Sequence, residues 1–419
     1  MKVHDVIPPD AQATRLLMRP WFIIAIALLL RLAWAALVPV EPVSDSVLYD
    51  AFARSIAAGT GYAYPSGALT VYWPVGTSAV YATIYSIFGP GFGPIVVFQS
   101  LLGALIVGLT WRLANDYLGP LAAAFAAWFT AFWPLLIQFT TVLASELLFI
   151  ALLLAALNVW STRRLPTFWR AVFWGALIAA ATYVRPTAWP LLLIFPLLEW
   201  VFRRETRSVV VLVVASTLTA AILFAPWVYR NYQLFDRFVL VAANGGVNLW
   251  MGNNPQSTGG YMPLPPTSFA DEVERDRYLG RKAVEFIASE PSSYVRLALR
   301  RLIGTYDRES IGVVWNEPGL RQRVGSAEVM ALKIVSSAFW WSMLLLGGLG
   351  AVQVARLRLA RKTWPILAAL LFFAAVPVLT VAQDRYHVPL NPLLAILAAL
   401  GALQLLRYKN RPVLPEHHV

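Results

Sequence analysis

Residues 21–40 read WFIIAIALLLRLAWAALVPV, and residues 41–61 read EPVSDSVLYDAFARSIAAGTG. The first stretch has the length that an α-helix needs to cross a bilayer, roughly 20 mostly apolar residues. Its one charge, Arg31, falls near the middle, where a guanidinium costs about 2.5–3.5 kcal/mol and normally faces a bundle interior or a water-filled cavity. The two stretches together predict a membrane-spanning helix followed by a polar segment at the membrane surface.

The composition of the whole chain agrees with a membrane protein. Of its 419 residues, 58% are hydrophobic and only 13% are charged, whereas soluble proteins carry about 25% charged residues. The chain has no cysteine, which excludes disulfides, thiolate catalysis and cysteine-ligated metals. Its four histidines include two at the C-terminus, His417 and His418, which argues against a multi-histidine metal site.

The apolar stretches predict an all-α polytopic membrane protein with about ten transmembrane helices. They fall near residues 21–40, 93–114, 119–138, 146–160, 170–184, 187–202, 208–228, 330–354, 364–382 and 388–406. Polar segments divide the chain into a membrane module (1–228, with a first outer loop at 41–92), an extracytoplasmic segment (229–329) and C-terminal membrane helices (330–419). The first apolar run lacks a small-residue cleavage site, so we expect no cleavable signal peptide.

The basic residues predict the orientation. Every alternate connection is rich in Arg and Lys, whereas the two short loops on the other side carry one Arg each, Arg185 and Arg385. Basic loops stay in the cytoplasm, so we expect both termini inside and both long polar segments outside. The net charge of +12 is then a consequence of topology, and no nucleic acid is expected as a partner.

The few acids left on the outer side are candidates for a general base. Outside segment 229–329 they are Glu41, Asp45, Asp50, Glu146 and Asp384. Asp45 precedes a helical pattern that ends near Gly59 and predicts an amphipathic helix at the membrane surface, and residues 72–89 predict a second one. Asp45 is therefore either the N-cap of the first surface helix or a functional carboxylate.

Three arginines could serve an anionic ligand. Arg185 and Arg385 lie on the outer side, where two guanidiniums could hold a phosphate. Other contacts remain open alternatives. Arg385 could form a salt bridge with Asp384 or contact lipid headgroups, and Glu146 could pair with Arg185 or with Arg31. The Gly- and Asn-rich run at 244–255 suits turns and close backbone approach, but it lacks the features of a nucleotide-binding loop. Residues 271–303 predict an amphipathic, Arg-rich helix against the membrane.

These pieces, in this order, resemble the polyprenyl-phosphate-sugar-dependent glycosyltransferases of the GT-C superfamily, in particular the bacterial family 39 (protein-mannosyltransferase-like) group. The aminoarabinose lipid A transferases are more distant. The matching pieces are Ser44-Asp45-Ser46 with Tyr49, Gly59/Gly61-Tyr62, Tyr72-Trp73-Pro74, Ser145-Glu146, Arg185-Pro186, Arg230-Asn231-Tyr232, Gly246–Asn254 and Arg385-Tyr386. They span nearly the whole chain.

The resemblance implies an inverting hexosyl- or pentosyltransferase in the bacterial cytoplasmic membrane. It implies a sugar donor on undecaprenyl or decaprenyl phosphate, and a glycan, lipid or protein acceptor at the outer face. It assigns the catalytic carboxylate to Asp45. The donor phosphate would be held by Arg185, Arg385, Tyr386, Arg31 and Arg230, and the substrate pocket would include Tyr49, Tyr72, Trp73, Glu146 and Asn253.

Two departures narrow that expectation. Asp45 is followed by Ser46, where many relatives have an Asp-Glu pair, and Tyr72-Trp73 stands before Pro74, where the lipid A enzymes have an acid–base pair. The first removes a second acid, and the second argues against a lipid A acceptor. Asp45, Glu146 and Asp384 leave a divalent cation open as a cofactor. A flippase or a non-catalytic envelope scaffold remains the alternative function, although no internal repeat of the transporter type is evident.

Overall fold

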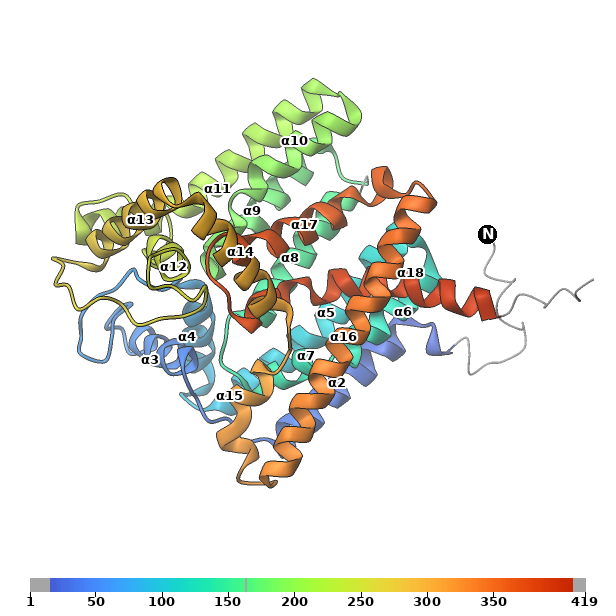
Figure 1. The fold of residues 1–419 in the computed structure, drawn as a ribbon, viewed down its shortest axis with the longest axis horizontal. Coiled ribbons are helices and arrows are strands. Elements are labelled where there is room, and N and C mark those ends of the chain that lie inside the picture. The colour runs from blue at the N-terminus through green and yellow to red at the C-terminus, as the bar shows by residue number, and fades with distance from the viewer. Residues whose placement is uncertain (1–15, 163, 410–419) are drawn as a thin grey trace, which may run out of the picture.

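The computed structural model describes residues 16–162 and 164–409. Apart from two isolated β-bridges, the regular structure of these residues is helical, which confirms the predicted all-α class. The termini on which part of the predicted orientation depends, with Lys2, Arg15 and Arg411, lie outside the described residues. Figure 1 shows long helices running side by side, with shorter helices gathered at one end, here called the pocket end.

Seven helices in the described residues are long and apolar enough to cross a membrane. They are α2 (Pro20–Leu37), α5 (Phe92–Leu118), α9 (Thr167–Val184), α11 (Thr206–Phe235), α16 (Ser326–Arg356), α17 (Ala360–Leu379), and η4 (Asp384–Leu390) with α18 (Asn391–Lys409). The boundary expected at 228/229 falls inside α11, because the helix continues past Pro226 to Phe235.

The other three expected stretches are also helical but shorter. The stretch 119–138 is divided into α6 (Pro120–Ala131) and α7 (Pro134–Gln138), followed by η2 (Phe139–Thr141), with a bend of 55°. Pro134 accounts for the break, because a proline cannot donate the backbone hydrogen bond that a continuous helix needs. The remaining two are α8 (Glu146–Ser161) and α10 (Leu191–Arg203).

Close backbone packing joins α16 to α18. A Cβ atom at Gly350 would collide with the carbonyl oxygen of Leu397, and one at Gly401 would collide with that of Leu346. Glycine at these positions lets the two helices approach closely, as small residues do between membrane helices. This close contact, here called the α16–α18 seam, holds α18 against the bundle (Figure 1). It also holds η4, which leads into α18.

The first polar segment forms the two helices that the sequence predicts, α3 (Asp45–Ala57) and α4 (Gly76–Phe88). They pack on each other at the pocket end (Figure 1). Ser44 occupies the N-cap position of α3, with a φ of 52°, and makes no side-chain capping bond. Asp45 is therefore the first helical residue and not the N-cap, so its carboxylate is available for another contact.

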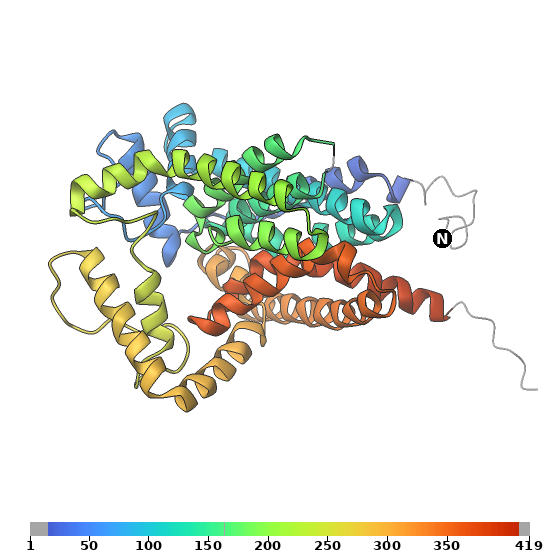
Figure 2. The ribbon, with the colours of Figure 1, turned by 90° about the horizontal axis from the view of Figure 1, so that it is seen from above.

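The large polar segment forms a layer of helices: α12 (Gly245–Gly252), α13 (Glu272–Ser289), α14 (Pro291–Tyr306) and α15 (Ile311–Leu320). Figure 2 shows α13 and α14 projecting from the bundle, on the side away from the C-terminal end of α18. Arg301 joins α14 to α12 and α17, because its guanidinium donates to the carbonyl oxygens of Gly252 and Val378, each at 2.6 Å. The layer thus closes over the pocket end.

Candidate active site

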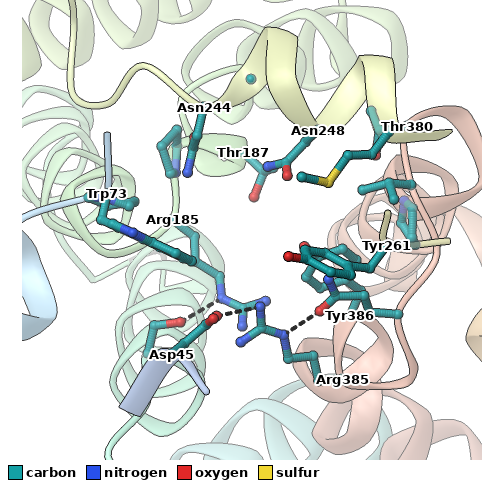
Figure 3. A pocket seen from close by; sticks show the side chains of 18 of the residues that line it. Asp45, Trp73, Arg185, Thr187, Asn244, Asn248, Tyr261, Thr380, Arg385 and Tyr386 are labelled. Atoms are coloured by element: carbon teal, nitrogen blue, oxygen red, sulfur yellow. Dashed lines mark hydrogen bonds and ion pairs between the residues drawn. The ribbon is translucent and has the colours of Figure 1, made fainter. Parts of the chain in front are cut away.

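A cavity of about 710 Å³ lies at the pocket end, where the first polar segment, the large segment and the last two helices meet. Figure 3 shows Asp45, Arg185 and Arg385 on one side, facing Asn244, Asn248 and Tyr261 on the other. The predicted site residues that line the cavity are Asp45, Tyr49, Tyr72, Trp73, Arg185, Arg385 and Tyr386. Residues from distant parts of the sequence thus share one cavity.

An ion pair between Asp45 and Arg385 forms the centre of the site. The Asp45 Oδ2 atom lies 2.6 Å from an Nη atom of Arg385, and the two side chains are 16% and 9% exposed. Arg385 also donates through Nε to the Gln383 side-chain oxygen at 2.8 Å, and its guanidinium lies 4.9 Å from the centre of the Trp315 ring. Arg385 pairs with Asp45 and not with the neighbouring Asp384 that the sequence offered as its salt-bridge partner.

A second guanidinium, that of Arg185, is fixed beside the first pair (Figure 3). Arg185 forms an ion pair with the fully buried Glu146, and its Nε donates to the Ser145 hydroxyl at 3.0 Å. The chain turns here because α9 ends at Val184 and Pro186 begins the short helix η3 (Pro186–Ala188). Glu146 supports Arg185 from behind the cavity wall, which settles the sequence alternatives for Glu146 in favour of Arg185.

Aromatic side chains form part of the wall near Asp45. The Tyr49 and Trp73 rings meet edge to face at 6.1 Å, and Tyr72 contacts Trp73 in the same way at 5.5 Å. Burial raises the pKa of both tyrosines above the ordinary value, so their hydroxyl groups stay protonated at neutral pH. Arg275 of α13 stacks over Tyr72 at 4.8 Å and brings a third guanidinium to the cavity.

Arg31 lies outside this cavity. Its buried guanidinium donates to the carbonyl oxygens of Ala27 at 2.9 Å and Ala131 at 3.3 Å. The second contact is at the break between α6 and α7, where backbone carbonyls lack helical partners. Arg31 therefore donates hydrogen bonds to backbone carbonyl oxygens where the helix is broken. Glu146, the acidic partner considered from the sequence, pairs with Arg185 instead.

Arg230 and Asn253 are also placed behind the cavity wall. Arg230 donates to the carbonyl oxygens of Thr70 at 2.8 Å and Tyr62 at 3.3 Å, which ties α11 to the first polar segment. The Asn253 amide donates to the Thr380 carbonyl oxygen at 3.0 Å, and its Oδ1 accepts from Arg301 at 2.9 Å. These contacts hold the segments that line the cavity.

Several residues that line the cavity are not predicted from the sequence. They are Thr187, Asn244, Asn248, Tyr261, Arg275, Trp315 and Gln383. Asn244 and Asn248 belong to the Gly- and Asn-rich run, which had been singled out for its backbone and not for its amide groups. Arg275 could not be distinguished by sequence from the other basic residues of α13.

The carboxylates do not form a ready cation site. In residues 16–162 and 164–409, no group of three or more His, Asp or Glu side chains is placed to hold a metal ion. Asp45 and Glu146, two of the three carboxylates considered for a divalent cation, each face a guanidinium instead. A cation placed beside Asp45 or Glu146 would be repelled by the guanidinium groups of Arg385 and Arg185.

Several solved structures of low sequence identity share the fold of this chain. No family model and no curated protein sequence matches the chain. Among solved structures, the apo oligosaccharyltransferase of Archaeoglobus fulgidus superposes with a TM-score of 0.57 at 13% identity, over 93% of this chain and 51% of that chain. The AglB oligosaccharyltransferase of that organism, in complex with an inhibitory peptide and a dolichol-phosphate, gives 0.55 at 14% identity over 93% and 50%.

A second kind of GT-C protein has the same fold. ArnT from Cupriavidus metallidurans in the apo state superposes with a TM-score of 0.51 at 15% identity, over 93% of this chain and 60% of that chain. The chain thus spans about half of the oligosaccharyltransferases and three fifths of ArnT. The similarity establishes the GT-C fold of a multi-pass membrane protein.

Proposed function

We propose that this chain is an inverting glycosyltransferase that moves a sugar from a polyprenyl-phosphate donor to an acceptor hydroxyl. The observation that carries the proposal is the Asp45–Arg385 pair, a carboxylate and a guanidinium 2.6 Å apart in the cavity of a GT-C fold. Attack by a hydroxyl needs a base, and departure of a phosphate needs a cation. The pair supplies both within one cavity.

In the proposed reaction the Asp45 carboxylate accepts the proton of the acceptor hydroxyl as its oxygen bonds to the anomeric carbon. The bond between that carbon and the donor phosphate oxygen breaks, and the sugar's configuration is inverted. The phosphate leaves with its negative charge, which Arg385, Arg185 and Arg275 stabilise. Phosphate binding to Arg385 also weakens the hold of Arg385 on Asp45, and this leaves the carboxylate free to act as the base.

The apolar part of the cavity suits the polyprenyl chain of the donor. Phe149 of α8 and Phe373, Val376 and Pro377 of α17 line it on the side of the membrane helices. The dolichol-phosphate in the AglB complex, a protein of the same fold, supports a lipid phosphate as the ligand class. We infer undecaprenyl or decaprenyl phosphate as the carrier, a hexose or pentose as the sugar, and a glycan, lipid or protein as the acceptor.

The orientation is part of the proposal. The turn between α16 and α17 lies at the end of the bundle away from the cavity (Figure 1). Arg358 lies in this turn, Arg356 ends α16, and Arg361 and Lys362 lie at the start of α17. Basic residues mark the cytoplasmic side. We therefore place the protein in the cytoplasmic membrane of a bacterium, with the cavity facing outward and membrane lipids around the bundle.

The experiment supplies purified protein in lipid nanodiscs with a panel of polyprenyl-phosphate sugars and candidate acceptors, and it follows release of free polyprenyl phosphate. Release that requires the wild-type protein, with the sugar recovered on the acceptor in inverted configuration, supports the proposal. Movement of the intact donor between leaflets of proteoliposomes without release would make the protein a flippase instead. If neither polyprenyl phosphate release nor donor movement is observed, the protein would be a non-catalytic scaffold.

A further inference from the structure

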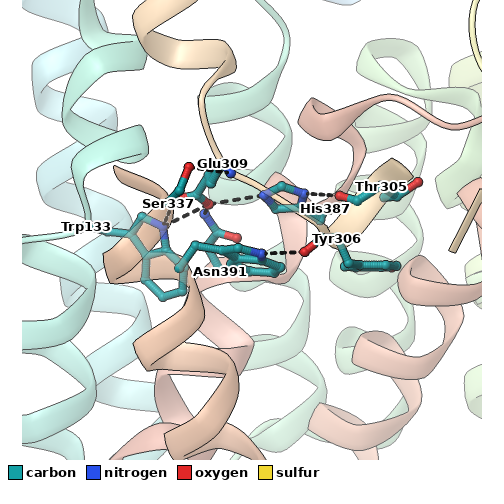
Figure 4. Close-up of polar contacts among 8 residues, drawn as sticks. Trp133, Thr305, Tyr306, Glu309, Ser337, His387 and Asn391 are labelled. Carbon is teal, nitrogen blue, oxygen red and sulfur yellow. Dashed lines mark hydrogen bonds and ion pairs between the residues drawn. The ribbon is translucent and has the colours of Figure 1, made fainter. Parts of the chain in front are cut away.

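A buried carboxylate lies behind the cavity and takes no part in the proposed chemistry. Glu309, between α14 and α15, is fully buried (Figure 4). Its Oε2 accepts from the Trp133 indole N–H at 2.8 Å, and its Oε1 accepts from the Asn391 amide at 2.7 Å. The Nε2 atom of His387, also fully buried, lies 3.2 Å from the same Oε1.

The surroundings of His387 fix where its protons are. Its Nδ1 lies 2.7 Å from the carbonyl oxygen of Thr305, which can only accept, so Nδ1 carries a proton. The contact of Nε2 with Glu309 then needs one further proton, held either by the imidazole or by the carboxyl group. Burial raises the pKa of the Glu309 carboxyl, whereas the contacts with His387 and with the indole and amide donors act in the opposite direction and favour the charged carboxylate. The Trp340 ring, stacked on the imidazole at 4.2 Å, stabilises a charged imidazole.

The pair also lies between two segments that line the cavity. His387 is two residues after Arg385 in η4, and Glu309 stands two residues before α15, which carries Trp315. The ring of Trp315 is the one on which the Arg385 guanidinium rests. A shift of Glu309 relative to His387 would therefore move the Trp315 ring away from the Arg385 guanidinium.

We propose that Glu309 and a doubly protonated His387 form a buried charge pair that positions the Trp315 ring against the Arg385 guanidinium. Asp384 on η4 is a further carboxylate that interacts with His387, and Arg308, Arg385 and Asp307 are charged groups that interact with Asp384. The faces of α16 and α18 contribute the uncharged Trp340 and Asn391. The charge pair itself is independent of the proposed function, whereas its effect on donor binding depends on it.

Nitrogen NMR tests the protonation of His387 directly. The chain has four histidines, so replacing His4, His417 and His418 with Asn leaves one labelled imidazole. At pH 7 both ring nitrogens of His387 are expected to carry protons. In Glu309→Gln the imidazole is expected to become neutral, with its proton on Nδ1. A neutral His387 in the protein that retains Glu309 would overturn the proposal.

The positioning role is tested with undecaprenyl phosphate alone as the probe. His387→Gln is expected to weaken its affinity at least tenfold, because it leaves the buried Glu309 carboxylate without its cation. Glu309→Gln is expected to weaken the affinity as well, because the neutral imidazole is no longer held by a charge. The double substitution removes both charges and should restore most of the affinity. Glu317→Gln is the matched control, since Glu317 lies on α15 in a pair with Arg321 and Lys333.

The outcomes separate this inference from the proposed function. Losses that simply add in the double variant would show that the two side chains act through packing and not as a charge pair. A wild-type protein that does not bind undecaprenyl phosphate would overturn the proposed function and the positioning role together. In that case the NMR experiment still decides whether the charge pair exists.

Discussion

The carboxylate of Asp45, at the start of α3, is held 2.6 Å from the guanidinium of Arg385, at the start of the last membrane helix. The two residues come from opposite ends of the chain and meet in one cavity. A carboxylate held by a guanidinium is oriented by it, yet it can be released when an anionic ligand competes for the guanidinium. In the proposed function, Arg385 binds the lipid phosphate and the released Asp45 carboxylate then acts as the base.

Arg385→Lys should weaken binding of undecaprenyl phosphate by about tenfold or more. Arg385 contacts Asp45, Gln383 and the Trp315 ring at the same time, which a single ammonium group cannot do. Affinity measured in nanodiscs tests this expectation. The control is Arg321→Lys, an exposed residue directly after α15. If Arg385→Lys binds undecaprenyl phosphate as tightly as Arg321→Lys does, Arg385 has no part in binding the phosphate.

Glu146→Gln should lower the thermal unfolding midpoint. The substitution leaves the Arg185 guanidinium without its carboxylate in a site where Glu146 is fully buried. Breaking a buried ion pair from one side costs about 3–5 kcal/mol. Glu146→Gln combined with Arg185→Gln should recover part of the loss, whereas a midpoint equal to that of the wild type in the single variant would show that the pair adds nothing to stability.

Gly350→Ala should destabilise the protein, because its new methyl group would meet the carbonyl oxygen of Leu397 across the α16–α18 seam. Overpacking of this kind costs about 1–3 kcal/mol. Gly348→Ala on the same helix is the control, since a Cβ there has nothing within 4 Å. Unfolding in detergent compares the two variants. The seam is unimportant if Gly350→Ala is as stable as Gly348→Ala.

Cysteines introduced at Ser66 and Ser268 should react with a membrane-impermeant maleimide on intact cells. Both residues are exposed and lie in the two polar segments expected outside. A cysteine at Asp116, exposed near the C-terminal end of α5, should react only after the membrane is permeabilised. The chain has no cysteine of its own to give a background. The reverse pattern would invert the orientation.

The sequence predicted the membrane fold well because long apolar runs have few alternatives to a helix. All ten expected stretches became helices, and α3 and α4 appeared where their amphipathic patterns placed them. The break between α6 and α7 went unpredicted, although Pro134 marks it. Arg31 was singled out because of its depth in the first span, yet its partners are backbone carbonyls, which no residue pattern reveals.

The site was predicted only in part. Charges at the outer face pointed to Asp45, Arg185 and Arg385, because few charged residues remain there once topology is accounted for. Their pairing could not be predicted, since Asp384 adjoins Arg385 in sequence and Asp45 approaches it only in the folded chain. Glu309 lies in a long polar segment where a carboxylate is unremarkable by sequence, and only its burial sets it apart.

The central claim is that the Asp45 carboxylate is the base for sugar transfer. The most direct measurement compares wild type with Asp45→Asn in two assays, transfer to acceptor and affinity for undecaprenyl phosphate. Glu41→Gln is the control, an exposed carboxylate just ahead of α3. We predict that Asp45→Asn slows transfer by about 10²–10⁴-fold, as loss of a general base does, while affinity is kept or increased because Arg385 is released. Transfer at the wild-type rate in Asp45→Asn would contradict the claim.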